Sequence, residues 1–383
     1  MVANRLTARE LVEAVESGRE LHVLDVRAPA RLASGRVDIV PQAQFHNIKG
    51  SDLLDLPDPR GAGLDPGKPI AVVCGAGNDS LKIAQHLNRH GFEAASLEGG
   101  ISAWMHMLVP RELEPPPQLD RLVQFDRIGK GALGYLLVSE GEAVLIDPSR
   151  HAEACLAAAR DSGARIVAIA DTHVHADYIS GGPALAARLE VPYHIHAADA
   201  VSPYDGTPGR LDYAPLADGD AIHFGRAALR AVHTPGHTEG SLSYRLGDAC
   251  VFTGDFLFIG SVGRPDLGGK TEAWTKVLWQ SLERAKQEWP AAIRVLPAHY
   301  ASSAERNRDH TLERLFGELC DPEGLNGPLA MPDEQTFTDW VLGRAGKFPD
   351  VYRRIKTINI GLETVDDSEA DILEAGRNEC ALG

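Results

Sequence analysis

The pattern of hydrophobic and polar positions changes near residue 115. Before that point, the apolar runs at 21–26 and 69–74 each lead into a polar loop, which is typical of short buried strands. Residues 80–91 place apolar side chains at helical spacing and end on Gly91. This alternation of strands and helices predicts a small α/β domain with a parallel sheet.

After residue 120, the pattern predicts a second, larger α/β domain. Residues 135–148 form two apolar runs around Glu140 and Gly141, which predicts a hairpin. The segments 164–173, 228–237 and 249–256 each predict a strand with polar residues at its carboxyl end, where sites in α/β folds tend to lie. From about residue 306 the pattern becomes helical.

Three consecutive prolines at 115–117 indicate an extended spacer, because proline disfavours helix interiors and ladder pairing. A chain of 383 residues also exceeds the size of about 250–300 residues at which single cores stop growing. We therefore predict an α/β multi-domain protein: a first domain at 1–112, a linker at 113–120, a second domain at 121–305, and a helical C-terminal extension at 306–383 packed on the second domain.

Charge and composition exclude some partners. The chain has 54 acidic and 38 basic residues, a formal net charge of −16, and no basic stripe, so nucleic acid is not expected as a partner. It has neither a basic start followed by an apolar run nor a long uncharged stretch, so we expect no membrane association and a cytoplasmic location. Five widely spaced cysteines without a CxxC pair argue against a disulfide framework and a structural zinc knuckle.

Potential metal ligands gather at four places in the second domain, each after a predicted strand. Alternate residues of a strand share a face, and the turn at 235–236 can bring a later histidine towards it. Four such groups in order indicate a metal site and not isolated polar residues. They are His173, His175 and Asp177; His233 and His237; Asp255; and His299.

The segments THVHADY, TPGHT, TGD and PAHY resemble the metallo-β-lactamase superfamily across about residues 120–300. The resemblance implies an αββα sandwich with the metal site on one edge. Dinuclear hydrolases of this superfamily have HxHxDH, but here Tyr178 follows Asp177. A phenol with a reference pKa of about 10 is a poor zinc ligand, so a second metal would lack a ligand.

Within the superfamily, the sequence most resembles the persulfide dioxygenases. This resemblance implies that His173, His237 and Asp255 bind one Fe(II) per chain, as a 2-His-1-carboxylate triad. It implies that three further residues orient these ligands: His175, Asp177 and His299. Persulfide dioxygenases usually have histidine at the place of Tyr178, which here would line the pocket and take part in catalysis.

The stretch 256–269 carries Gly-Arg followed two residues later by Asp, as the family does. Its resemblance implies that Arg264 and Asp266 bind substrate, because a guanidinium pairs with the carboxylates of a thiol carrier. The alternative is a surface ion pair between these two residues.

The loop at 74–80, CGAGNDS, follows a predicted strand and precedes a helix. Backbone N–H groups and the helix dipole there favour the negative charge of a thiolate or persulfide on Cys74. With LDVRAPARLASGRV and LEGGISAWM, this loop resembles a single rhodanese domain over about residues 5–110. The resemblance implies that Cys74 carries sulfur, although Asp79 stands where the family has arginine, which disfavours thiosulfate as a donor.

Together, the two resemblances imply a persulfide dioxygenase coupled to sulfane-sulfur transfer at Cys74. The expected small-molecule partners are a glutathione-like thiol persulfide and O2, and the expected assembly is a homo-oligomer, a dimer. Two alternatives stay open. One is a zinc-dependent thioesterase of the glyoxalase II type, and the other is a non-enzymatic sulfur carrier or persulfide sensor.

Overall fold

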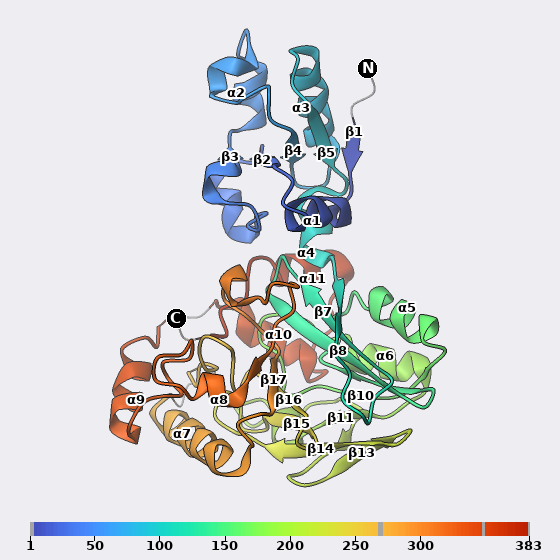
Figure 1. Ribbon diagram of the computed structural model, residues 1–383, viewed down its shortest axis with the longest axis vertical. Helices are drawn as coiled ribbons and strands as arrows, with labels where there is room; N and C mark the ends of the chain where they lie inside the picture. Colours follow the sequence, from blue (N-terminus) through green and yellow to red (C-terminus); the bar gives the residue numbers. More distant parts are fainter. Residues whose placement is uncertain (1–3, 267–270, 347–348, 382–383) are drawn as a thin grey trace. The chain divides into compact units, whose positions relative to one another are not determined.

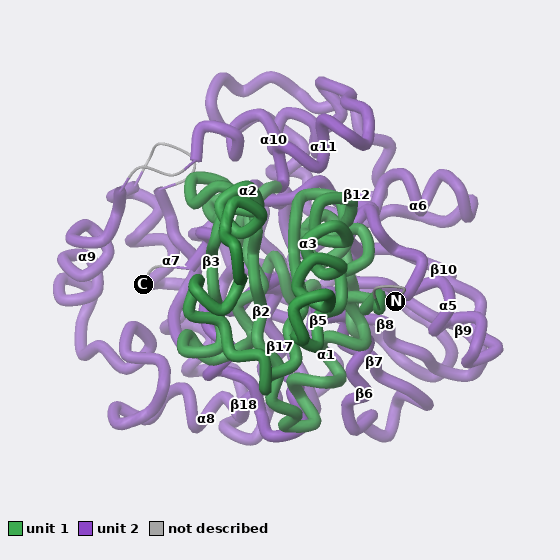
Figure 2. Tube along the Cα trace, turned by 90° about the horizontal axis from the view of Figure 1, so that it is seen from above, with its two compact units in different colours: residues 1–109, 127–130, 375–377 green, residues 110–126, 131–374, 378–383 purple. Residues whose placement is uncertain are grey.

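The computed structural model describes residues 4–266, 271–346 and 349–381 (Figure 1). Figure 2 shows the two compact units into which the chain divides. Unit 1 comprises residues 1–109, 127–130 and 375–377, and unit 2 comprises residues 110–126, 131–374 and 378–383. Residues 114–120, which contain the three prolines, form no helix or strand.

Unit 1 is built on a five-stranded sheet in which all neighbouring strands are parallel, in the order β1-β5-β4-β2-β3. Its strands are β1 (Asn4–Leu6), β2 (His22–Asp25), β3 (Phe45–Asn47), β4 (Ile70–Val73) and β5 (Ala94–Leu97). Its helices are α1 (Ala8–Glu16), α2 (Gly50–Leu54), α3 (Asn78–Arg89) and α4 (Gly100–His106). The predicted small α/β domain is confirmed.

Both faces of this sheet are buried. On β2, Val23 belongs to the core that contains Trp104 of α4, whereas Leu24 belongs to the core that contains Leu87 of α3. Consecutive residues of a strand point to opposite faces, so a strand covered on both sides is apolar throughout. This explains why the runs at 21–26 and 69–74 are apolar at nearly every position.

Unit 2 contains two sheets. The seven-stranded sheet, in the order β12-β11-β10-β9-β8-β7-β6, has strands β6 (Val109–Leu113), β7 (Arg121–Arg127), β8 (Ala132–Ser139), β9 (Glu142–Ile146), β10 (Arg165–Ala170), β11 (Tyr193–Ile195) and β12 (Ala214–Pro215). The six-stranded sheet, ordered by number, has β13 (Ala221–Phe224), β14 (Ala227–His233), β15 (Leu242–Leu246), β16 (Cys250–Gly254), β17 (Arg294–Pro297) and β18 (Arg314–Leu315). The predicted hairpin is the antiparallel pair β8 and β9, whose turn residues Glu140 and Gly141 both have positive φ.

The two sheets share one apolar core, to which β8 contributes Leu137 and β15 contributes Tyr244. Helices α5 (Glu153–Asp161) and α6 (Gly182–Leu189) pack on the first sheet, and α7 (Thr271–Glu288) adds Leu278 and Leu282 to the core. The predicted sandwich is confirmed.

The C-terminal extension is helical, as predicted. It contains α8 (Phe316–Leu319), α9 (Glu334–Leu342), α10 (Val351–Asn359) and α11 (Asp367–Leu373). Helix α9 packs on α7, where the rings of Phe337 and Trp279 lie 5.3 Å apart. No helix in the described ranges is long and apolar enough to cross a membrane.

Candidate metal centre

The three predicted metal ligands of unit 2 and the predicted orienting residue His299 each follow the end of a strand. The loop with His173 comes after β10, His237 after β14, Asp255 after β16, and His299 after β17. All four side chains are buried, at 1% exposure or less. The predicted strands at 164–173, 228–237 and 249–256 are therefore confirmed as the elements that deliver these residues.

His173, His237 and Asp255 form a compact group. The Oδ2 atom of Asp255 lies 3.5 Å from the Nε2 atom of each histidine. Within the described ranges, none of these three buried atoms has a hydrogen-bond partner. Such buried polar atoms are costly unless another group satisfies them, so the three fit a metal ion that would accept their lone pairs.

The tautomers of the two histidines leave Nε2 available. Nδ1 of His237 lies 2.9 Å from the carbonyl oxygen of Arg264, which can only accept, so this nitrogen carries the proton. Nδ1 of His173 lies 3.0 Å from the hydroxyl of Thr172, which itself donates to the carboxylate of Asp147. Both Nε2 atoms are therefore unprotonated, as metal ligands require.

Burial and neighbouring charges set the protonation of the centre. Burial holds the pKa of His237 well below its usual range. Burial opposes the charge of Asp255 as well, but His299 and His173 hold the pKa of this carboxyl well below its usual value. The centre therefore offers neutral imidazole and ionised carboxylate, the forms in which both bind metals.

His299 connects two carboxylates. Its Nδ1 lies 2.6 Å from Asp255 and its Nε2 lies 3.1 Å from Asp177. Although burial opposes it, these two carboxylates raise the pKa of His299 to about 10. The thiol of Cys380 lies in the same group of possible ligands, with all ligand atoms of Asp177, His299 and Cys380 within 4.8 Å of one another.

Tyr178 is buried beside His175. Its hydroxyl lies 2.9 Å from Nε2 of His175, and the two rings stack with centroids 4.3 Å apart. Burial and the nearby carboxylates raise the pKa of Tyr178 well above its usual value, so the side chain is a neutral phenol. The same Nε2 lies 3.2 Å from Asp147, while Nδ1 of His175 has no hydrogen-bond partner among the described residues.

The C-terminal extension holds the metal-binding loop in place. The side-chain amide of Asn359, on α10, donates to the carbonyls of His175 and Tyr178 at 2.9 and 2.8 Å, and its oxygen accepts from the backbone of Ser180 at 3.0 Å. Sequence reasoning missed Asn359 and also Asp147, which lies just after β9. The position of Asp147 at a strand end was a usable signal, whereas nothing local marks Asn359.

Arg264 and Asp266 are paired and buried. The guanidinium makes two hydrogen bonds of 2.7 and 2.6 Å to the carboxylate, and it donates to the carbonyls of Glu379 and Gly346. Both side chains are buried, so the pair is not the surface ion pair that the sequence left open as an alternative. Arg264 thus links the C-terminal segment, through the carbonyl of Glu379, to His237, whose Nδ1 lies at the backbone carbonyl of Arg264. A role for Arg264 and Asp266 in substrate binding stays a prediction.

In unit 1, Cys74 lies at the end of β4 and in front of α3. Its Sγ accepts a hydrogen bond from the backbone N–H of Gly77 at 3.1 Å and lies 3.2 Å from the hydroxyl of Ser80. A side chain at Gly77 would meet the backbone of Gly99 at 2.9 Å, so the tight loop requires glycine. Asp79 has a side chain that is 81% exposed and lies 3.9 Å from Lys82.

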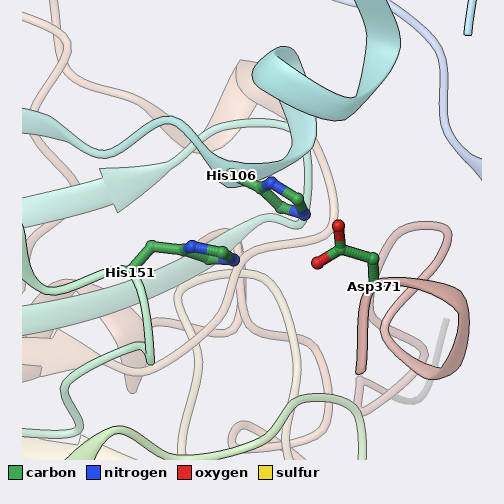
Figure 3. A group of neighbouring side chains, drawn as sticks. All are labelled: His106, His151 and Asp371. Carbon is green, nitrogen blue, oxygen red and sulfur yellow. The ribbon is translucent and has the colours of Figure 1, made fainter. Parts of the chain in front are cut away.

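Figure 3 draws three more side chains of metal-binding type: His106, His151 and Asp371. His106 belongs to unit 1, whereas His151 and Asp371 belong to unit 2.

Known proteins resemble both units. Residues 129–312 match the metallo-beta-lactamase superfamily, and residues 7–107 match the rhodanese-like domain. The hydroxyacylglutathione hydrolase of Gloeobacter violaceus is 32% identical over 192 residues, which cover 49% of this chain and 71% of that protein. Persulfide dioxygenase ETHE1 of Homo sapiens is 34% identical over 164 residues, which cover 41% of this chain and 59% of that protein.

A solved structure agrees with the fold of unit 2. The metallo-beta-lactamase from Staphylococcus aureus subsp. aureus COL aligns with a TM-score of 0.53 at 26% identity, covering 68% of this chain and 74% of that one.

Proposed function

Because the chain belongs to the metallo-β-lactamase superfamily of metal-dependent enzymes and also carries a rhodanese-like domain, we propose that it is a persulfide dioxygenase. In this reaction, one thiol persulfide, one O2 and one water give sulfite, the free thiol and two protons. The S–S bond of the persulfide breaks, and its terminal sulfur is oxidised. The best support is the group of His173, His237 and Asp255 beside a tyrosine where a dinuclear enzyme needs histidine.

Two imidazoles and one carboxylate suit Fe(II), which would supply coordination positions for both persulfide and dioxygen when bound. The chain contributes the surroundings. The carbonyl of Arg264 and the hydroxyl of Thr172 keep the protons of His237 and His173 on Nδ1. The centre is buried, so bulk water is kept from a sulfur that is being oxidised.

Tyr178 argues for one metal ion. A neutral phenol, stacked on His175, stands in the position of the second-metal histidine. With both nitrogens of His299 hydrogen-bonded to carboxylates, the remaining groups for a second ion are Asp177 and Cys380.

For Cys74, we propose exchange of sulfane sulfur with the same thiol. The thiolate would attack the outer sulfur of the persulfide, forming a Cys74 persulfide and releasing the carrier as its thiolate. The N–H of Gly77 and the amino end of α3 favour the negative charge on the sulfur. Because the side chain of Asp79 is exposed, its charge is well solvated, which weakens its effect on an anionic sulfur donor.

A zinc-dependent thioesterase is the second candidate. The observation in its favour is Nδ1 of His175, which lacks a hydrogen-bond partner in the described part of the chain and belongs to a ring 4.4 Å from that of His173. Three imidazoles are a common zinc set. The similarity to hydroxyacylglutathione hydrolases adds to this reading.

One experiment separates the two candidates. Protein purified without oxygen and loaded with Fe(II) is given glutathione persulfide, and oxygen uptake, sulfite, iron and zinc are measured in the same sample. We expect uptake with sulfite at about one iron per chain. His173→Ala should abolish it, whereas His223→Ala, on the exposed side of β13, should not. Zinc binding with thioester hydrolysis and no oxygen uptake would refute the proposal.

A further inference from the structure

A cavity of about 250 Å³ lies in unit 2 next to the metal centre. Two of its lining residues adjoin metal ligands in the sequence, since Val174 follows His173 and Thr238 follows His237. Trp274 of α7 lines it as well, and α10 of the C-terminal extension contributes Lys356.

Lys356 is the unusual member of this lining. It is only 2% exposed, yet no described residue forms a hydrogen bond or an ion pair with its ammonium group. Buried lysines are rare unless they are paired, because removing an ammonium from water is costly. Burial lowers the pKa of Lys356, and the carboxylate of Asp199 partly offsets this.

The carboxylate of Asp199 already accepts three hydrogen bonds and forms none with Lys356. It accepts hydrogen bonds from the backbone of Val174 and Gly240 and from the hydroxyl of Thr238, at 2.7 to 2.8 Å. These bonds hold the loops beside the metal centre. The cavity is therefore lined by an ammonium group that has no hydrogen-bond or ion-pair partner among the described residues.

The guanidinium of Arg264 differs from Lys356 in this respect. Four of its five N–H donors are already used by Asp266 and by two backbone carbonyls. A substrate carboxylate would have to displace these bonds at Arg264, whereas at Lys356 it would satisfy a buried charge.

We propose that this cavity is the binding site for the anionic part of the thiol carrier, and that Lys356 pairs with it. The shared chemistry is a carboxylate or a phosphate on a low-molecular-weight thiol, whose sulfur then extends towards the metal centre. This inference deepens the proposed function and rests on it for the identity of the ligand as a thiol.

The test measures equilibrium binding by calorimetry, with the S-methylated forms of glutathione, coenzyme A and cysteamine. Glutathione carries carboxylates, coenzyme A carries phosphates, and cysteamine carries no anion. Lys356→Met removes the charge with little change of volume. We expect it to weaken binding of the anionic thioether by about tenfold to 100-fold, as for other hydrogen bonds to charged groups. Lys356→Arg should restore part of the affinity.

Lys276→Met is the matched control, because Lys276 is half exposed on α7 and pairs with Glu272. It should leave the affinity unchanged. If Lys356→Met does not fold, judged by its melting temperature, Lys356→Gln removes the same charge and takes its place. A Lys356-dependent loss for the glutathione form identifies a carboxylate as the ligand group, and a loss for the coenzyme A form identifies a phosphate.

Three outcomes would overturn the proposal: equal binding by wild type and Lys356→Met, an equal loss for S-methylcysteamine, or no binding of either anionic thioether to the wild type. The readout does not depend on oxidation. A chain that binds S-methylglutathione through Lys356 but consumes no oxygen would end the proposed function and leave this inference standing.

Discussion

Gly263 offers the sharpest test of how the metal centre is held. A methyl group at this position would lie 1.7 Å from the carbonyl oxygen of Asp255 and 3.2 Å from Cβ of His237. Because the first neighbour is backbone, no side-chain rotation relieves the contact. The separation must grow to at least 3.0 Å, so Gly263→Ala must displace one of the two segments by about 1.3 Å.

That displacement is large compared with the tolerance of a metal site, where ligand distances vary by about 0.2 Å. We therefore expect Gly263→Ala to retain less than a tenth of the wild-type metal after dialysis against a weak chelator. Overpacking in a close-packed interior also costs about 1–3 kcal/mol, so the melting temperature should fall.

Gly260→Ala is the matched control on the same loop. Its added methyl group would lie 3.5 Å from the side chain of Glu305, an ordinary contact. Metal content by mass spectrometry and thermal unfolding should both stay close to wild type. If Gly263→Ala binds metal as tightly as Gly260→Ala, the loop does not hold Asp255 and His237 in the way described.

Two further predictions concern the surroundings of the centre, and a third concerns the cysteines. Tyr178→His should leave the bound metal at about one per chain, measured by elemental analysis, because both nitrogens of His299 are already hydrogen-bonded to carboxylates; a rise to two per chain would contradict the single-metal centre. Asn359→Ala should lower the free energy of unfolding by about 3 kcal/mol, since three buried backbone groups lose a partner; a loss under about 0.5 kcal/mol in denaturant unfolding would be inconsistent with this. Burial raises the pKa of Cys155 and Cys250 to about 12, and it also raises the pKa of Cys320, but Cys320 is partly exposed; it should be alkylated before Cys155 and Cys250 at pH 8, which peptide mapping checks, and equal labelling of these three would contradict it.

Much of the fold could be predicted because it follows from local patterns. Apolar runs that end in polar residues located β2, β4, β10 and β16, and Glu140 with Gly141 located the hairpin turn. Strand-end positions indicated a metal site, and the resemblance to the persulfide dioxygenases implied the triad of His173, His237 and Asp255, which the structure brings together. Local periodicity and strand ends are properties that a single sequence expresses directly.

Other features depend on contacts between distant parts of the chain. Asn359 donates a hydrogen bond to a carbonyl 184 residues away. Lys356 becomes a candidate binding residue only because α10 places it in the lining of the cavity. Likewise, the motif around Arg264 predicted that its guanidinium binds substrate, but it did not predict that this group donates hydrogen bonds to the carbonyls of Glu379 and Gly346. No pattern within a helix or strand encodes such partners.

The hydrogen bonds of Asn359 have a consequence for synthesis of the protein. The loop with His173 and His175 leaves the ribosome long before the amide that ties down its backbone. Until α10 has emerged, two carbonyls and one N–H of that loop lack their native partners, so a nascent chain presents loose histidines to whichever cations the cell supplies. We therefore expect correct metal binding only after α10 has emerged, and chains that stop before residue 359 should bind the wrong metal or be degraded.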